Sequence, residues 1–239
     1  MATSIYTPQR LYLIQVATLP PTGAPVPCYL IQTTDGKNIL IDSGLPANFR
    51  LPEGRPIPEF GKSVVEQLAI LGLKPKDIDM LICTHFDVDH AGGHDLFKNA
   101  ELVVQRQHYD LARNGYSRFA SIRSHWDHPE LRYRTVDGNT ELLPGLELIE
   151  TSGHVPGHQS VLVRLPETGP VLLAIDAVPV QHAFTAERKA GPLDVDEEQL
   201  RASTRKLLDL IEREHVGLVI FGHDGKQWPT LKKAPEYYA

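Results

Sequence analysis

The sequence THFDVDHAGGH, residues 84–94, places three histidines and two aspartates directly after the apolar run at 80–83. From His85 to His90 the spacing is HxDxDH. Imidazole nitrogens and carboxylate oxygens suit divalent metals, and alternate positions on an extended or tightly turned backbone can converge on one point. The apolar run predicts a buried strand, so these side chains are expected at its carboxyl end, where open α/β sheets place their sites. Taken alone, the stretch fits either a metal site or a polar surface loop.

Four other places in the chain repeat this arrangement, with a histidine or aspartate at the end of an apolar run. They are Asp42, His154 with His158 shortly after it, Asp176 and His223. Any one of these residues could instead be a helix cap or turn residue. Together they favour a metal site, because Asp176 ends a wholly apolar run and its desolvation would be costly unless it were paired or bound to metal.

The composition is ordinary for a globular protein of 239 residues, with 41% apolar and 23% charged residues, and predicts one domain over residues 1–239. The net charge of −6 and the scattered basic residues argue against nucleic acid or an anionic membrane as partner. No apolar run reaches about 18 residues, and residues 1–10 lack the apolar core of a signal peptide. Cys28 and Cys83 are expected to be buried, reduced thiols, which indicates a cytoplasmic location.

Hydrophobic periodicity and turn residues predict alternating strands and helices. Strands are expected at 11–16, 28–33, 38–42, 80–83, 102–104, 132–136, 140–142, 147–150, 160–165, 171–175 and 217–221. Helices are expected at 61–73, near Asp95, at 105–113 and at 197–214. The Pro- and Gly-rich segments 19–27 and 45–60 predict loops, and residues 115–128 fit either a pocket lining or a solvated loop.

With these residues in order, the chain resembles the metallo-β-lactamase superfamily and, within it, the N-acyl-homoserine lactonases. The likeness runs through VPCYLIQTTDGKNILIDSG, THFDVDHAGG, ELVVQRQHYD, LPGLELIETSGHVPGHQS, VLLAIDA, IFGHD and PEYYA, and so covers nearly the whole chain. The resemblance implies an α/β fold, a four-layer αβ/βα sandwich of two mixed β-sheets flanked by helices. It also implies two divalent metal ions at one edge of the sandwich.

The resemblance further implies a role for each candidate residue. The metal ligands would be His85, Asp87 and His154 at one ion, Asp89, His90 and His223 at the other, and Asp176 as the bridge. A hydroxide shared by the metals would attack the substrate carbonyl, and Asp89 would pass a proton to the departing alkoxide. Asp42 and His158 would orient ligands or brace turns.

This chain departs from the family pattern at two positions. Asp87 stands where the family has a histidine, and a carboxylate there hardens the site. Zinc is the expected metal, with Mn²⁺ or Fe²⁺ as alternatives because of Asp87. Pro179 stands where the lactonases carry a tyrosine that helps to hold the substrate carbonyl. Candidate substrate contacts in this chain are Val88, Tyr109, Tyr116 and His182.

The leading hypothesis is a dinuclear hydrolase that opens a lactone or similar ester, with an N-acyl-homoserine lactone as the best candidate substrate. Its partner would be a small molecule, and the protein a monomer or homodimer. Two alternatives remain open: a phosphodiesterase, organophosphate hydrolase or other ester hydrolase of the same fold, since in-line displacement also uses two metals, and a metal-bearing binding protein without turnover. Nothing in the sequence resembles the β-lactamases beyond the shared ligand pattern.

Overall fold

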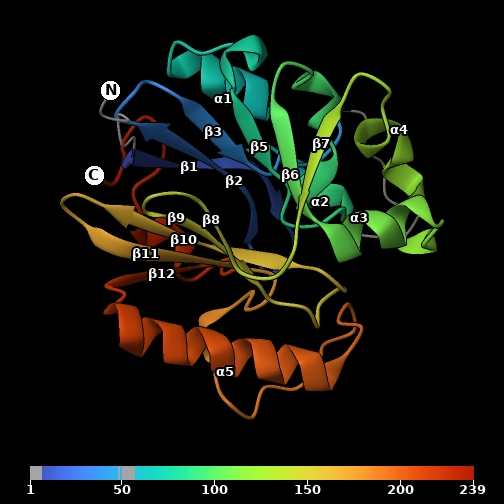
Figure 1. The fold of residues 1–239 in the computed structure, drawn as a ribbon, viewed down its shortest axis with the longest axis vertical. Helices are drawn as coiled ribbons and strands as arrows, with labels where there is room; N and C mark the ends of the chain where they lie inside the picture. The colour runs from blue at the N-terminus through green and yellow to red at the C-terminus, as the bar shows by residue number, and fades with distance from the viewer. Residues whose placement is uncertain (1–6, 48, 50–56) are drawn as a thin grey trace.

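Two β-sheets stack face to face in the computed structural model, which describes residues 7–47, 49 and 57–239 (Figure 1). The first sheet contains, in spatial order, β4 (Glu59–Phe60), β1 (Pro8–Leu19), β2 (Ala24–Thr33), β3 (Asn38–Ile41), β5 (Met80–Ile82), β6 (Glu101–Gln105) and β7 (Arg132–Val136). The second contains β12 (Leu218–Phe221), β11 (Gly169–Ile175), β10 (Gln159–Leu165), β9 (Leu146–Glu150) and β8 (Thr140–Leu143).

Both sheets are mixed. In the first sheet β4, β1, β2 and β3 pair antiparallel, whereas β3, β5, β6 and β7 are parallel. In the second, β8, β9, β10 and β11 pair antiparallel and β12 runs parallel to β11. Parallel neighbours present their carboxyl ends at the same edge, which is where the candidate ligands follow their strands.

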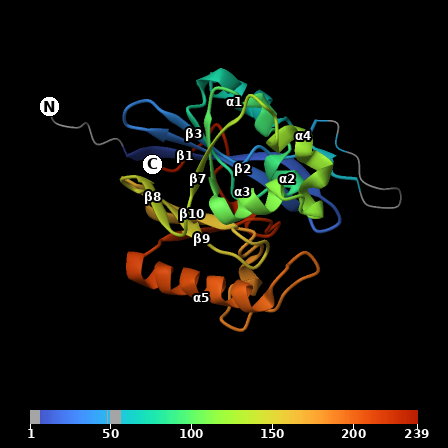
Figure 2. The same ribbon diagram turned by 45° about the vertical axis from the view of Figure 1, so that its right-hand side comes forward.

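Helices cover both outer faces, as the family resemblance implied. The α-helices are α1 (Val64–Ile70), α2 (Val88–Ala91), α3 (Arg106–Arg113), α4 (Arg123–Trp126) and α5 (Glu197–Glu214). Short 3-10 helices are η1 (Pro75–Asp77), η2 (His94–Leu96), η3 (Ser117–Ile122), η4 (Gln181–Ala183) and η5 (Trp228–Thr230). α5 covers the second sheet and α1 to α4 lie on the side of the first, so the predicted four-layer sandwich is confirmed (Figures 1 and 2). Among the described residues, no helix is both long and apolar enough to cross a membrane.

Strands β1, β2 and β3 of the first sheet are buried on both faces. In β1, Leu11 and Leu13 belong to the apolar core between the two sheets, while Tyr12 and Ile14 belong to the cluster that includes Val64 of α1. Strand side chains alternate between faces, so a strand covered on both sides reads as a nearly continuous apolar run. This explains why these strands were recognisable in the sequence.

The two longer predicted helices have clear start signals. Ser63 and Glu66 form a capping box at the start of α1, in which each side chain bonds the backbone N–H of the other residue. The Asp196 side chain accepts the Gln199 N–H at the start of α5, and His215 ends that helix in the left-handed conformation. α5 has the predicted limits, whereas α1 is shorter than the segment 61–73.

The predicted loop at residues 19–27 is wrong for its second half, because β2 already begins at Ala24. Pro25 and Pro27 pair with β1 on one side of this segment. On the other side, β3 pairs with β2 only from Tyr29 onward. Proline lacks the N–H that a second neighbour would need, so it is tolerated where a strand is paired on one side only.

Two other segments are now resolved in part. The predicted irregular loop at 45–60 falls largely outside the described residues, although its end forms β4 against β1. The segment 115–128 folds into η3 and α4 and buries Phe119, Ile122 and Trp126 in one apolar cluster. It is therefore packed against the domain and is not a solvated loop.

The turn after the histidine-rich stretch requires close backbone contact. Gly92 donates its N–H to the carbonyl of Gly44 at 2.8 Å, which ties this turn to the end of β3. A Cβ on Gly92 would lie 2.2 Å from Cδ of Pro46 and 2.7 Å from the Gly44 carbonyl oxygen. Only glycine fits at this position without movement of the backbone.

Gly92→Ala is therefore expected to lower the free energy of unfolding by about 2 kcal/mol, the scale of an overpacked site. Urea unfolding followed by circular dichroism measures this change. Gly217→Ala is the matched control, because its Cβ would meet nothing nearer than 3.9 Å, and it should change stability by less than about 0.5 kcal/mol. Equal effects of the two substitutions would contradict the steric argument.

Candidate metal centre

Seven candidate ligands come together where strands of both sheets end. They form three overlapping groups, His85 with Asp87 and His154, Asp89 with His90 and His223, and His85 with His90 and Asp176. Within each group the nitrogen and oxygen atoms lie within 4.8 Å of one another. The segments after β5, β11 and β12 and the loop between β9 and β10 each contribute. The structure thus brings together every residue predicted as a ligand.

The first group has the spacing of metal ligands. Oδ2 of Asp87 lies 3.4 Å from Nε2 of His85 and 3.1 Å from Nε2 of His154. Ligands at 2.0–2.2 Å from a tetrahedral cation are separated by roughly 3.3–3.6 Å. The three atoms therefore surround a point that a divalent cation fits.

The second group is slightly wider. Oδ2 of Asp89 lies 3.8 Å from Nε2 of His90 and 3.6 Å from Nε2 of His223. These separations also suit one cation shared by two imidazoles and a carboxylate. The side chain of Asp89 is 20% exposed, so this group is open to solvent on one side.

Asp176 lies between the two groups and turns one oxygen to each. Its Oδ2 is 3.9 Å from Nε2 of His85 and 3.5 Å from Nε2 of His154. Its Oδ1 is 3.4 Å from Nε2 of His90 and 3.0 Å from Nε2 of His223. One carboxylate in this position can ligate two cations at once.

Several of these atoms are buried without an ordinary partner. Nε2 of His85, Nε2 of His90 and Oδ1 of Asp176 have no hydrogen bond within the described part of the chain. A buried polar atom without a partner is costly, and these three point toward the same two positions. The donor set thus fits two divalent cations.

Each of the four imidazoles is oriented through its other nitrogen. The Nδ1 contacts are His85 with Oγ1 of Thr84 (3.1 Å), His90 with Oδ2 of Asp42 (2.8 Å), His154 with Oδ1 of Asp194 (2.9 Å) and His223 with the carbonyl of Pro25 (2.8 Å). Such contacts fix the tautomer and the ring direction of a metal ligand. All four Nε2 atoms consequently face the same centre.

Asp42 lies where the sequence placed it, behind the ligands. It is fully buried and accepts hydrogen bonds from the backbone N–H and the hydroxyl of Thr84, at 2.8 and 2.7 Å. Both Asp42 and Ile175, the residue before Asp176, adopt positive φ angles of 57° and 52°. Such conformations are unfavourable for residues other than glycine and tend to cluster at functional sites.

His158, the other predicted supporting residue, is also buried at the centre. Its Nδ1 lies 2.9 Å from the hydroxyl of Thr151, and its ring centroid lies 5.0 Å from that of His85. Burial, together with nearby His85, lowers the pKa of His158 well below its usual value. A neutral ring here packs behind His85 and braces the turn that carries His154.

The charges of the ligands depend strongly on one another. Burial opposes ionisation of Asp87, but hydrogen bonds from His154 and His85 lower its pKa well below the usual value. Burial likewise opposes the charge on His154 and His223, yet Asp194 and Asp176 respectively raise the pKa of each to about 9. Without cations, protons on these imidazoles would balance the three carboxylates.

Sequence reasoning missed two residues at the centre. Arg118 of η3 donates through Nε to Oδ1 of Asp87 at 2.6 Å, and its Nη2 bonds the other oxygen, Oδ2. Asp194 orients His154 and lies 3.6 Å from the guanidinium of buried Arg188. Both come from segments without periodicity, and the only signal was the basic and aromatic character of residues 115–128.

A cavity of about 630 Å³ opens beside the second group. It is lined by Thr22, Val180, Gln181, His182, His223, Asp224, Gly225 and Lys226. Of the predicted substrate contacts, only His182 lines this cavity. Tyr109 packs on Tyr133, and Tyr116 packs on Phe119. Val88 packs against the apolar cluster that contains Phe119 and Trp126.

Pro179 contributes to the centre through its backbone. Its carbonyl accepts the N–H of His223 at 2.8 Å, which holds that ligand at the end of β12. No side-chain donor can replace the family's tyrosine from this position, because proline carries none.

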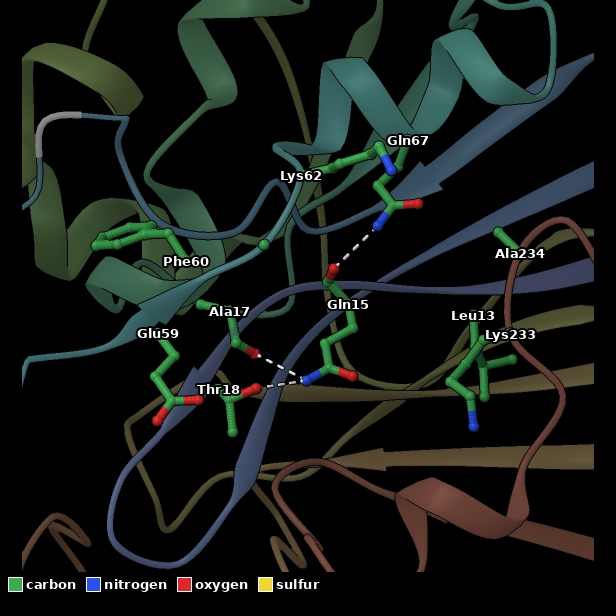
Figure 3. Close-up of a pocket in the computed structure, with 11 residues that line it drawn as sticks. Leu13, Gln15, Ala17, Thr18, Glu59, Phe60, Lys62, Gln67, Lys233 and Ala234 are labelled. Atoms are coloured by element: carbon green, nitrogen blue, oxygen red, sulfur yellow. Dashed lines mark hydrogen bonds between the residues drawn. The ribbon is translucent and has the colours of Figure 1, made fainter.

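A second cavity, of about 450 Å³, lies near β1, β4 and residues 233–234 (Figure 3). Within its lining, Gln15 donates to the Ala17 carbonyl and the Thr18 hydroxyl, and accepts at its backbone carbonyl from Gln67 (Figure 3). None of the seven candidate ligands lines this cavity.

Comparison with known proteins agrees with this geometry. The model of the metallo-beta-lactamase superfamily matches residues 21–223. An N-acyl homoserine lactonase from Bacillus sp is 34% identical over 89% of this chain and 86% of its own length. The lactonase AttM from Rhizobium radiobacter is 33% identical over 96% of this chain and 98% of its own.

Solved structures show the same relationship. A mutant of B. thuringiensis AiiA, with N-decanoyl-L-homoserine bound at the active site, superimposes with a TM-score of 0.85 at 30% identity, over 97% of this chain and 100% of the other. An N-acyl homoserine lactone hydrolase with the product N-hexanoyl-L-homoserine at its catalytic metal center gives 0.84 at the same identity and coverage. The chain belongs to the metallo-β-lactamase superfamily and, within it, to the family of the N-acyl homoserine lactonases.

Proposed function

We propose that this protein is a metal-dependent hydrolase that opens the ring of N-acyl homoserine lactones. The observation that carries the proposal is Asp176, whose two oxygens face two separate sets of donors. Relatives that match nearly the whole chain are lactonases, which supports the substrate class. The Lys and Arg residues are scattered, which favours a small molecule over a polymeric anion.

In this proposal His85, Asp87 and His154 hold one divalent cation, Asp89, His90 and His223 hold the other, and Asp176 bridges them. When bound, two such cations polarise a carbonyl and activate water as a nucleophile at neutral pH. Zinc suits the imidazole-rich donor set, while Asp87 makes Mn²⁺ or Fe²⁺ an alternative.

Asp89 is proposed to return the proton to the leaving alkoxide. Its side chain is the most exposed carboxylate among the seven ligands, at 20% against 14% for Asp87 and 10% for Asp176. It also lies 3.6 Å from His223, which lines the large cavity. A general acid must reach the departing oxygen, and Asp89 is the ligand carboxylate most accessible from solvent.

The cavity beside His223 is proposed to receive the substrate. His182 lines it and is exposed, so this side chain can take over part of the carbonyl contact that Pro179 cannot make. A single domain over residues 1–239, a cytoplasmic location and a monomeric or homodimeric state stay predictions from the sequence.

Purified protein supplied with zinc is expected to hydrolyse a long-chain N-acyl homoserine lactone, which is measured by proton release. Hydrolysis should stop after the metal is removed by chelation. Readdition of the metal should restore the rate. Hydrolysis of bis-aryl phosphates faster than of any lactone would favour the phosphodiesterase alternative instead. Ligand binding without turnover under zinc, manganese or iron would favour a binding protein.

Asp89→Asn is expected to reduce kcat on a lactone by about 100-fold or more, the usual contribution of a general acid. A p-nitrophenyl ester releases a stable anion that needs no proton, so its hydrolysis should fall much less. Metal content measured on the same sample separates loss of the acid from loss of a ligand. Equal losses on both substrates at full metal content would exclude Asp89 as the acid.

Chelation should also destabilise the fold. Cations that bind only the folded state stabilise it by mass action. Verified removal of metal is expected to lower the melting temperature by about 10 °C or more, since binding worth about 4 kcal/mol corresponds to that shift in a chain of this size. Scanning calorimetry before and after chelation measures it, and an unchanged melting temperature would refute the coupling.

A further inference from the structure

Arg118 makes four contacts in or beside the first cation position, which is the one formed by His85, Asp87 and His154. Nε donates to Oδ1 of Asp87, and Nη2 donates to Oδ2 of the same carboxylate. Nη2 also lies 3.0 Å from Nε2 of His154, and Nη1 donates to the carbonyl of Leu193 at 2.6 Å. The guanidinium thus forms a bidentate pair with the residue that replaces the family's histidine.

The atoms that Nη2 contacts are the same atoms that would bind a cation. Oδ2 of Asp87 and Nε2 of His154 are 3.1 Å apart and belong to the first donor group. Nε2 of His154 can bind a metal only through a free lone pair, which leaves no place for a proton on this nitrogen or for a donor such as Nη2. A cation at the first position must therefore displace Nη2 from His154 and share Asp87 with it.

The second position has no comparable competitor. Within the described residues, the ion pairs recorded for Asp89 are with His90 and His223 alone. Arg118 is positively charged. Its ion pair with Asp87 holds it at the first position, where its side chain is only 22% exposed. Like charges separated by a few ångströms at partly buried sites repel strongly, because little water screens them.

We propose that Arg118 competes with the divalent cation at the first position, so that the second position fills at much lower metal concentration. Arg118 is thus a positioning residue: it offsets the charge that Asp87 adds and makes the two cation positions unequal. The inference rests on the proposed metal centre but needs no assumption about the substrate.

The test is titration of the metal-depleted, full-length protein with Co²⁺ or Zn²⁺. Calorimetry monitors the binding of either metal, and visible absorption also monitors the binding of cobalt. The native protein is expected to show two steps of different affinity. Arg118→Gln should tighten the weaker step by about tenfold or more and leave the tighter step unchanged. Retention of the tighter step also shows that the variant is folded.

Arg123→Gln is the matched control, because Arg123 lies in the next helix and pairs with Asp127, away from the ligands. It should bind metal as the native protein does. Arg118→Lys keeps the charge but loses the planar fork, so it should tighten the weaker step less than Arg118→Gln does. His223→Gln removes a ligand of the second position, so the weaker step at the first position should remain in this variant. Adding Arg118→Gln to it should still tighten that weaker step.

Two equal steps in the native protein, or a weaker step that Arg118→Gln leaves unchanged or weakens further, would overturn the proposal. Neither result would contradict the proposed hydrolysis of lactones. Conversely, two unequal steps with no lactone hydrolysis would leave the role of Arg118 standing and refute the proposed substrate.

Discussion

The metal centre depends on the hydrogen bonds that the buried carboxylate of Asp42 accepts. This group is completely shielded from water, where an unpaired carboxylate would be very costly. It is satisfied by the backbone and side chain of Thr84 and by Nδ1 of His90. The backbone of Ser43 then donates to the carbonyl of His90. The path of the ligand-bearing loop is therefore the one that satisfies this carboxylate, and the positive φ of Asp42 is retained for it.

The strands and the set of candidate ligands could be predicted because both follow local patterns, whereas the four-layer arrangement was implied by the family resemblance. Strands buried on both faces give apolar runs, and the ligands stand at the ends of those runs, as with Asp176 after β11. Arg118 and Asp194 could not be predicted, since each reaches the centre from an irregular segment and contacts residues 31 and 40 positions away. The misjudged start of β2 has a similar cause, because Pro25 is compatible with a strand only where one side lacks a neighbour.

Asp87 and Arg118 act together as one ion pair within the metal centre. An aspartate in place of the family's histidine adds one negative charge to the centre, and the guanidinium removes it again. Together they carry the net charge of a neutral imidazole. Their geometry differs, however, because the carboxylate is held by a side chain from η3 whose Nη1 also bonds the Leu193 carbonyl. The position of this ligand is thereby coupled to the loops around residues 118 and 193.

The bond from His223 to the carbonyl of Pro25 joins residues 198 positions apart. Contacts of such long sequence separation form late, because a long loop must close before they contribute. During synthesis, His223 leaves the ribosome after nearly all of both sheets has been made. The growing chain therefore lacks a complete second cation site until His223 has been made, whereas the three ligands of the first site, His85, Asp87 and His154, are present earlier. A chain that does not yet include His223 cannot provide both cations with their full sets of ligands.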